Sequence, residues 1–341
     1  MAVTLQQIAQ AAGVSRGTVD RALNHRGRID PQVAEKIKQI AKEAGYQPNR
    51  AGRALAMSKK SVKIGVLVQA AGTPFMKEVM KGILDAKEEV ERLGAEVLLY
   101  TIDELDAVKA VEALQEMKTA GCGAVALVPM DDRRLRETIN AFSEEQIPVI
   151  TFNSDVADSK RLCFVGQNTF QSGRVAAGLM AEILPACAKV LIISGHPSSD
   201  GHKNRTRGFT KELKQIRPDV RMLDIQYAFD DDGMAELITG GMIKEYPDLE
   251  GIYLAASGVQ GVCRALCKAG FADRVRVISN DLTKQNLQCL AEGNIRFLIG
   301  QNGYRQGYEP VSLLFHKLLD GKNPREEFLY TELVIKTKYN I

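Results

Sequence analysis

The chain lacks the features that direct a protein into a membrane or an oxidising compartment. In 341 residues no apolar run reaches the roughly 18–20 residues that a membrane-spanning helix needs. Residues 1–15 show no basic start followed by an apolar stretch, so we expect no signal peptide. The six cysteines are scattered, mostly inside apolar runs, and form no Cys-x-x-Cys pair of a zinc site. We therefore expect a cytoplasmic protein with mostly buried, reduced thiols, no membrane contact and no metal.

Motifs for phosphate and dinucleotide binding are also missing. The strand-like run around Gly65 is not followed by the Gly-x-Gly-x-x-Gly pattern of a dinucleotide site, and no glycine-rich phosphate loop is present. Two histidines and an acid gather in residues 196–202, but they lack the i, i+4 spacing of zinc-binding helices. A polar loop at the mouth of a cleft is the simpler interpretation. We expect no cofactor and no catalytic residue.

The net charge of +3 conceals an uneven distribution. Residues 1–60 carry eleven Lys and Arg against four Asp and Glu, a net charge of +7. The remainder carries 34 basic and 38 acidic residues, a net charge of −4. A small basic segment on an acidic body indicates a polyanionic partner for that segment alone. The length predicts two or three domains, and the composition is ordinary for a soluble globular chain.

Three short helices are predicted in the basic segment. Thr4 and Gln7 fit a capping box at the start of the first helix, and Gly13 ends it. Ser15 caps the second helix almost at once, and Asp30-Pro31 opens the third. The predicted inward faces are Leu5, Ile8, Ala9 and Ala12, then Val19, Ala22 and Leu23, then Val33, Ile37, Ile40 and Ala44.

The first two helices and the tight turn Gly13-Val14-Ser15 match a helix-turn-helix. In that motif the N-terminal residues of the second helix meet base edges in the major groove of DNA. Here those residues are Arg16 and Gly17, with Arg21 about one turn further on. The arginine fork suits the O6 and N7 atoms of guanine. A three-helix bundle with a solvated basic face is the alternative, but the capped turn and the arginines favour double-stranded DNA.

The segment VTLQQIAQAAGVSRGTVDRALN, followed by GYQPNRAGRALA, resembles the head of the lactose-repressor (LacI/GalR) family up to about residue 57. The resemblance implies a helix-turn-helix domain over residues 1–47 and a hinge helix with linker over 48–61. In that family the hinge becomes helical only on specific DNA, and a leucine at the position of Leu55 wedges into a minor-groove step and kinks the duplex. The implied DNA contacts are Thr4, Ser15, Arg16, Gly17, Thr18, Arg21, Asn24, Asn49, Arg50, Arg53 and Leu55.

Two residues, Asp20 and Gly17, depart from what the family resemblance leads one to expect. Asp20 stands where the family usually has serine, and a carboxylate is repelled by phosphate unless it accepts from a cytosine amine. Gly17 costs a helix about 1 kcal/mol relative to alanine. Gly52 similarly weakens the hinge helix. These departures leave the operator sequence open.

The body, residues 62–341, alternates continuous apolar runs with helical stretches such as residues 75–93. This alternation predicts parallel sheets that are covered on both faces. The predicted strands are 63–68, 96–100, 124–128, 148–152, 190–193, 251–255, 276–278 and 295–299. They are too many for one sheet, and the pattern restarts near Lys189. We therefore predict two flavodoxin- or Rossmann-like lobes: lobe 1 at about 62–167 and 302–329, and lobe 2 at about 168–301 and 330–341.

Ligands of such sheets bind beyond the carboxyl ends of the strands. Short amides, hydroxyls and carboxylates recur at these places, together with an arginine and an aromatic ring, and this set suits a neutral polyol. The segments that follow the predicted strands are Thr73-Pro74-Phe75, Met130-Asp131, Asn153-Ser154-Asp155, residues 196–205, Ala255-Ala256-Ser257, Asn280-Asp281 and Gln301-Asn302. The alternative for Asn153 and Asp281 is that each merely caps the helix that follows.

The body also resembles the periplasmic sugar-binding fold that serves the lactose-repressor family as its sensor, and it is closest to the ribose-binding type. The resemblance implies that Phe75 stacks on a sugar. Hydrogen bonds to the sugar are implied for Asn153, Arg205, Asp281 and Gln301, with Thr73 and Ser257 as weaker candidates. Asn153 replaces an aspartate-arginine pair and Ala255-Ala256 replaces asparagine-aspartate of the ribose-binding proteins, so ribose itself is not implied.

These observations predict a sequence-specific DNA-binding transcription regulator that acts as a repressor. A small polar effector, a sugar or sugar derivative, would control its binding to a pseudo-palindromic operator. The sequence ends just after a strand-like stretch with no further helix, so we expect a homodimer. A sugar-binding transport protein is one alternative, but it would need a signal peptide and would lack residues 1–60. An enzyme with a DNA-binding head is another, but it would need a phosphate loop or an acid–base pair.

Overall fold

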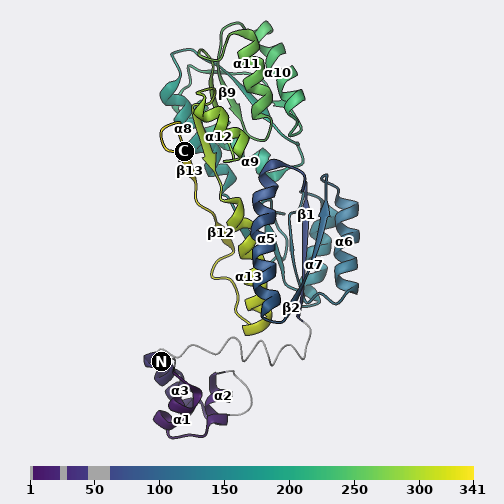
Figure 1. Cartoon of the computed structure of the whole chain (residues 1–341), viewed down its shortest axis with the longest axis vertical. Coiled ribbons are helices and arrows are strands. Elements are labelled where there is room, and N and C mark those ends of the chain that lie inside the picture. The colour runs from purple at the N-terminus through teal and green to yellow at the C-terminus, as the bar shows by residue number, and fades with distance from the viewer. Residues whose placement is uncertain (1–2, 24–28, 45–61) are drawn as a thin grey trace. The chain divides into compact units, whose positions relative to one another are not determined.

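The computed structural model describes residues 3–23, 29–44 and 62–341. Contacts divide the chain into two units, residues 1–56 and 57–341. The first unit is a small all-α head, and the second is an α/β body (Figure 1). Among the described residues, no helix combines the length and the apolar character that crossing a membrane requires.

The head contains the helices α1 (Leu5–Ala12), α2 (Arg16–Leu23) and α3 (Pro31–Glu43). The predicted capping box is present, because Thr4 Oγ1 accepts from the Gln7 N–H and the Thr4 N–H donates to Gln7 Oε1. Gly13 takes the left-handed conformation with a φ of 71°. Asp30 Oδ1 accepts from backbone N–H groups in the first turn of α3. The caps predicted from the sequence are therefore confirmed.

The head buries one small apolar cluster where its three helices meet. Its buried members are Ile8, Ala9, Ala12, Val19, Ala22, Ile37 and Ala41. The prediction that Ala44 belongs to this core is wrong: α3 ends at Glu43, Ala44 is exposed, and Ala41 fills the inward position one turn earlier.

Lobe 1 of the body is a parallel sheet between two layers of helices. Its strands are β1 (Val62–Gln69), β2 (Ala95–Ile102), β3 (Ala124–Leu127), β4 (Val149–Phe152), β5 (Cys163–Gly166) and β12 (Phe328–Tyr330), in the order β12-β5-β4-β3-β1-β2. The helices are α5 (Pro74–Arg92), α6 (Ala107–Thr119), α7 (Arg133–Glu144) and α13 (Gly303–Asp320). α5 and α13 cover one face, and α6 and α7 cover the other (Figure 1).

Lobe 2 repeats this plan. Its strands are β6 (Lys189–Ser194), β7 (Arg221–Met222), β8 (Gln226–Tyr227), β9 (Leu249–Leu254), β10 (Arg276–Asn280), β11 (Phe297–Gly300) and β13 (Val334–Lys336), in the order β13-β11-β10-β9-β6-β7, with β8 also paired to β6. The helices are α8 (Thr169–Ile183), α9 (Asp200–Ile216), α10 (Asp232–Glu245), α11 (Val259–Ala269) and α12 (Lys284–Ala291). α8 and α9 cover one face and α10 to α12 the other. Only β13 pairs antiparallel among the described strands.

The chain passes three times between the lobes, and buried side chains tie these crossovers together. Gln167 Nε2 of the first crossover donates to the Gly300 carbonyl of the second at 3.2 Å. Thr331 Oγ1 of the third donates to the Gln301 carbonyl at 2.8 Å. The predicted return to lobe 2 at residue 330 is corrected, because Tyr330 still pairs with β5 in the sheet of lobe 1.

Glycines let the helices beside the cleft approach backbone to backbone. A Cβ atom on Gly173 of α8 would lie 2.0 Å from the Arg205 carbonyl of α9, and Gly208 of α9 faces α8 in the same way. Gly82 of α5 and Gly307 of α13 allow the same close approach in lobe 1. We call each such pair of facing glycines a glycine notch. α8 therefore fixes the backbone of α9 at the level of Arg205.

Candidate functional site

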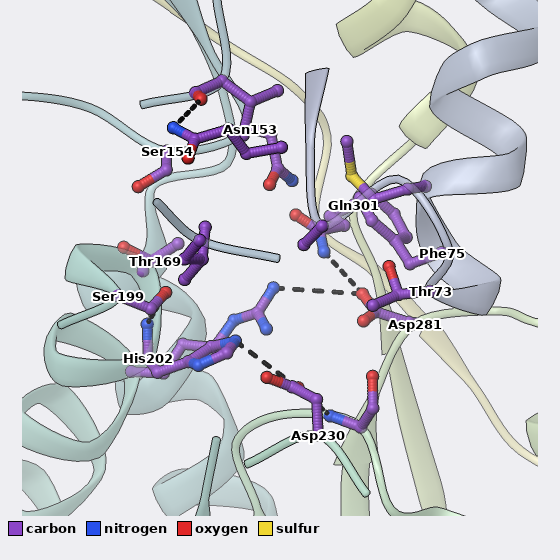
Figure 2. Close-up of a pocket in the computed structure, with 18 of the residues that line it drawn as sticks. Thr73, Phe75, Asn153, Ser154, Thr169, Ser199, His202, Asp230, Asp281 and Gln301 are labelled. Atoms are coloured by element: carbon purple, nitrogen blue, oxygen red, sulfur yellow. Dashed lines mark hydrogen bonds and ion pairs between the residues drawn. The ribbon is translucent and has the colours of Figure 1, made fainter. Parts of the chain in front are cut away.

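A cavity of about 750 Å³, open solvent at its mouth included, lies between the two lobes. The residues that the family resemblance implies as sugar contacts all line it: Thr73, Phe75, Asn153, Arg205, Ser257, Asp281 and Gln301. Figure 2 shows Thr73, Phe75, Asn153, Asp281 and Gln301 of this set converging from both lobes. The structure thus brings the whole predicted set together, and its role in binding stays a prediction.

Asn153 and Asp281 occupy corresponding places in the two lobes. Each directly follows a strand, β4 or β10, and each is left-handed, with φ values of 63° and 70°. Asparagine and aspartate tolerate this conformation better than other residues with a Cβ atom. Neither caps a helix: α12 is capped by Thr283, and no helix directly follows Asn153. The helix-capping alternative is therefore wrong for both.

A chain of buried amides joins these two residues across the crossover. Asn153 Nδ2 donates to Gln306 Oε1 at 3.1 Å, and Gln306 Nε2 donates to Gln301 Oε1 at 3.2 Å. Gln301 Nε2 in turn donates to Asp281 Oδ1 at 2.5 Å. The chain of hydrogen bonds thus connects Asn153 of lobe 1 with the Asp281 carboxylate of lobe 2.

Arg205 of α9 is the buried cation of the cavity. Its Nη1 donates to the Ala255 carbonyl at 3.1 Å, and its Nη2 donates to Gln167 Oε1 at 3.2 Å. Nη2 also lies 3.9 Å from Asp281 Oδ1. Burial raises the pKa of Asp281, although Arg205 and the hydrogen bond from Gln301 act in the opposite direction. The positive charge of the cavity is therefore already opposed by a carboxylate of the protein.

Sequence reasoning missed a second pair, His202 and Asp230. We predicted a loop over residues 196–202, but α9 begins at Asp200, so His202 lies in its first turn and points into the cavity. His202 Nε2 lies 3.9 Å from Asp230 Oδ1. Burial lowers the pKa of His202, and Asp230 opposes that shift. Asp230 follows β8, which has two residues, so no apolar run in the sequence marks the strand end before it.

Three buried polar atoms around the cavity have no hydrogen-bond partner in the described part of the protein. They are Ser154 Oγ, His202 Nδ1 and Arg205 Nε. A buried polar group left without a partner costs about 1–3 kcal/mol. A ligand rich in hydroxyl groups can donate to one of these atoms and accept from another. No group of three His, Cys, Asp or Glu among the described residues is arranged to hold a metal ion.

One ion pair bridges the two lobes beside the cavity. Lys203 Nζ of α9 lies 2.9 Å from Asp131 Oδ2, which follows β3 in lobe 1. Arg136 Nη2 reaches the same carboxylate at 3.4 Å. The lobes are thus joined here, as well as through the crossovers.

In the head, the predicted base-reading residues share the outer face of α2. Arg16, Gly17 and Arg21 are exposed, and Arg21 Nε donates to the Gly17 carbonyl at 3.2 Å. The Ser15 and Thr18 hydroxyls hydrogen-bond each other at 2.9 Å, and Thr4 is exposed at the start of α1. The other predicted DNA contacts lie outside the described residues: Asn24, Asn49, Arg50, Arg53 and Leu55.

The two units of the chain match two different protein families. A family model described as "Bacterial regulatory proteins, lacI family" matches residues 4–49, and one described as "Periplasmic binding protein domain" matches residues 64–323. Residues 4–49 therefore belong to a domain of the lacI family of bacterial regulatory proteins. The body is a periplasmic-binding-protein domain. The predicted fold class and the predicted pairing of a lacI-type head with a periplasmic-binding-protein-like body are therefore confirmed.

Individual proteins agree with this assignment. The HTH-type transcriptional regulator DegA of Bacillus subtilis is 26% identical over 216 residues, which are 63% of this chain and 62% of DegA, so this match spans less than two thirds of that relative. The ribose operon repressor of Halalkalibacterium halodurans is 24% identical over 345 residues, 98% of this chain and 96% of the repressor. The arabinose binding protein AraP of Geobacillus stearothermophilus has a TM-score of 0.69 at 26% identity, over 82% of this chain and 98% of AraP.

Proposed function

We propose that this lacI-family regulator binds a small sugar between its lobes and that the sugar controls its affinity for operator DNA. The observation that carries the proposal is that the seven predicted sugar contacts and three buried polar atoms without a hydrogen-bond partner in the described structure line one cavity. Sugar hydroxyls both donate and accept, so they suit the Asp281 carboxylate and the Arg205 Nε–H alike. Two relatives in the comparison, a ribose operon repressor and an arabinose binding protein, carry sugars in their names.

The charges of the cavity favour an uncharged sugar. Its buried cation, Arg205, already faces Asp281, and Asp230 adds a second carboxylate. His202 does not balance them at neutral pH, because burial lowers its pKa. A phosphate or sugar acid would place a further negative charge against two carboxylates.

For the head, we propose that Arg16, Gly17 and Arg21 read base edges while Ser15 and Thr18 hold the phosphate backbone. Their position on the outer face of α2 supports this assignment. Phosphate or minor-groove roles for the remaining residues rest on the sequence alone: Thr4, Asn24, Asn49, Arg50, Arg53 and Leu55. We further propose that a homodimer acts on a pseudo-palindromic operator in the cytoplasm.

The proposed switch has two states. Sugar bound across the cavity favours closed lobes, since its contacts come from both of them. Closure changes the geometry of lobe 1, which continues from the hinge segment at Val62. Operator and sugar then influence each other's affinity by the same factor.

A thermal-shift screen tests the sugar half of the proposal. We expect an uncharged pentose or hexose sugar to raise the melting temperature, because a ligand at about 100 times its Kd stabilises by about 2.7 kcal/mol. The phosphate ester of that sugar serves as the matched control and should give a smaller shift. The sugar that binds should also change operator affinity in fluorescence anisotropy. If neither uncharged sugars nor their esters shift the melting temperature, the proposed ligand class is wrong.

Substitution at Arg16 tests the DNA half. We expect Arg16→Ala to weaken binding to a selected operator by about 1–3 kcal/mol and to relax one base position. Lys36→Ala on α3, which removes one exposed positive charge outside the α2 face, is the control. Leu55→Gly should also weaken specific binding, and an unchanged affinity would remove the minor-groove wedge from the proposal.

A further inference from the structure

A second cavity, of about 560 Å³ with open solvent included, adjoins the first between the same two lobes. The two cavities share the lining residues Asn153, Ser154, Thr169 and Gly201. Gly201 has no side chain, and a Cβ atom there would meet only Thr169 and Ser199 at 3.7 and 3.8 Å. The residues between the cavities are thus small or short, and one ligand can pass from one cavity into the other.

A buried hydroxyl where the two cavities meet suggests a ligand there. Ser154 Oγ is buried and has no hydrogen-bond partner in the described part of the protein, and Ser154 lines both cavities. Figure 2 shows Ser154 beside Asn153, on the lobe 1 side. A hydroxyl in this position can donate to the oxygen that links two sugar rings.

Aromatic rings line the second cavity on the lobe 1 side. Tyr330 stacks on Phe328 with ring centroids 5.7 Å apart and an interplanar angle of 21°, and both rings meet Phe164 edge-on. Tyr330 nevertheless remains 46% exposed, which is unusual for a large side chain packed in an aromatic cluster. Each of these rings offers an apolar face to a ligand. The hydroxyl at the edge of the tyrosine ring is available for a hydrogen bond.

Planar polar groups face these rings from lobe 2. Asn204 and Arg207 of α9 line the cavity, and Asn204 Nδ2 donates to Asp200 Oδ2 at 2.6 Å. Asp155 lies on the lobe 1 side, where Arg161 Nε holds it at 2.6 Å. The guanidinium of Arg207 lies over the Phe170 ring, 5.2 Å from its centroid. The cavity lining thus holds this one cation and the carboxylates of Asp155 and Asp200, a balance that again suits an uncharged ligand.

We propose that the second cavity binds a second sugar ring, so that the effector is an uncharged disaccharide or glycoside that spans both cavities. The first ring contacts Phe75, Arg205 and Asp281, the linking oxygen lies near Ser154, and the second ring packs against Tyr330. This inference rests on the proposed function, because it extends the same sugar site.

Calorimetry on the full chain tests the inference with stated probes. The disaccharides are maltose, cellobiose, lactose, melibiose, sucrose and trehalose, and the monosaccharides are glucose, galactose and fructose. We expect at least one disaccharide to bind about tenfold or more tightly than its component monosaccharides. Tyr330→Ala should remove most of that difference and leave monosaccharide affinity unchanged. Tyr330→Phe, which keeps the ring, should restore it.

Tyr227→Ala is the matched control, because Tyr227 is 41% exposed and lines neither cavity. A monosaccharide that binds as tightly as every disaccharide overturns the inference and leaves the proposed function standing. A disaccharide whose affinity survives Tyr330→Ala also overturns it. If none of these sugars binds, the second-ring inference fails, and the proposed function fails only if the pentoses and other hexoses of the thermal-shift screen do not bind either.

Discussion

At the scale of single residues, the fold holds the Asp281 side chain in a fixed orientation before a ligand binds. Asn286, in the first turn of α12, donates through Nδ2 to the carbonyls of Asn280 and Asp281 at 3.1 and 2.9 Å. These bonds fix the left-handed turn, and the hydrogen bond from Gln301 fixes the carboxylate. The carboxylate therefore keeps a defined direction at low conformational cost to binding.

We expect Asp281→Asn to lower sugar affinity about tenfold or more. The substitution keeps the shape but removes a charge, and hydrogen bonds to charged groups contribute about 1.5–3 kcal/mol. It also leaves Arg205 without its carboxylate partner inside the cavity. Isothermal titration calorimetry with the sugar found by thermal shift measures the effect. Asp224→Asn, an exposed aspartate on lobe 2, is the control, and equal affinities for the two variants would contradict the site.

His202 should make the stability of the body depend on pH. Burial lowers its pKa in the folded protein below the ordinary value of 6.5. As the pH falls through about 6.5, the unfolded chain takes up a proton that folded His202 resists, so the free energy of unfolding decreases. Denaturant unfolding at pH 5.5 and 7.5 measures the slope, and His202→Gln should reduce it. A slope that is the same in wild type and variant would falsify this role.

The sequence predicted site residues well where a long apolar run marks the end of a strand. Asn153 and Asp281 follow such runs directly. Asp230 follows a strand of two residues, which leaves no such mark. Gln306 lies inside α13, and only the packing of the crossovers buries it. Periodicity along the chain carries no information about which distant segment will cover a residue.

At the scale of secondary-structure elements, the glycine notches set how closely α8 and α9 can pack. Gly173 and Gly178 both lie inside α8. In the structure Gly173 meets the backbone of α9, whereas nothing lies within 4 Å of a Cβ atom on Gly178. The long helices were predictable from periodicity, but their partners and close approaches depend on tertiary contacts. The short strands β5, β7, β8 and β12 were missed for the same reason.

We expect Gly173→Ala to reduce the free energy of unfolding by about 1–3 kcal/mol, because the added methyl group forces α8 and α9 apart. It should also weaken sugar binding, since the carbonyl that it displaces belongs to Arg205. Chemical denaturation and calorimetry measure the two effects. Gly178→Ala in the same helix is the matched control and should stabilise by up to about 1 kcal/mol. Similar stabilities for the two variants would show that the notch does not limit the packing.

At the scale of the whole body, the Lys203–Asp131 pair contributes to joining the lobes. Both side chains are partly exposed, at 44% and 36%, so the pair is worth about 0–1 kcal/mol. Small terms of this size suit a switch, because they bias closure without preventing reopening. Most of the energy that favours closure must then come from the ligand itself.

We expect Lys203→Ala to lower sugar affinity by about two- to fivefold, because the ion pair forms only when the lobes are together. The difference from wild type should shrink as salt concentration rises. Titration calorimetry at two ionic strengths measures both effects, with Lys244→Ala on α10 as the control. A loss of affinity that does not depend on salt would argue against an electrostatic bridge.

The position of α13 also governs the order in which the body can fold during synthesis. Lobe 1 begins with β1, but Val311, Leu314 and Phe315 of α13 complete one of its two apolar layers. These residues leave the ribosome only after β6 to β11 of lobe 2. Lobe 2 can therefore close most of its core while lobe 1 still exposes the apolar face of its sheet. The first lobe to emerge is the last to be finished, and nascent chains of this regulator are most prone to aggregation in that interval.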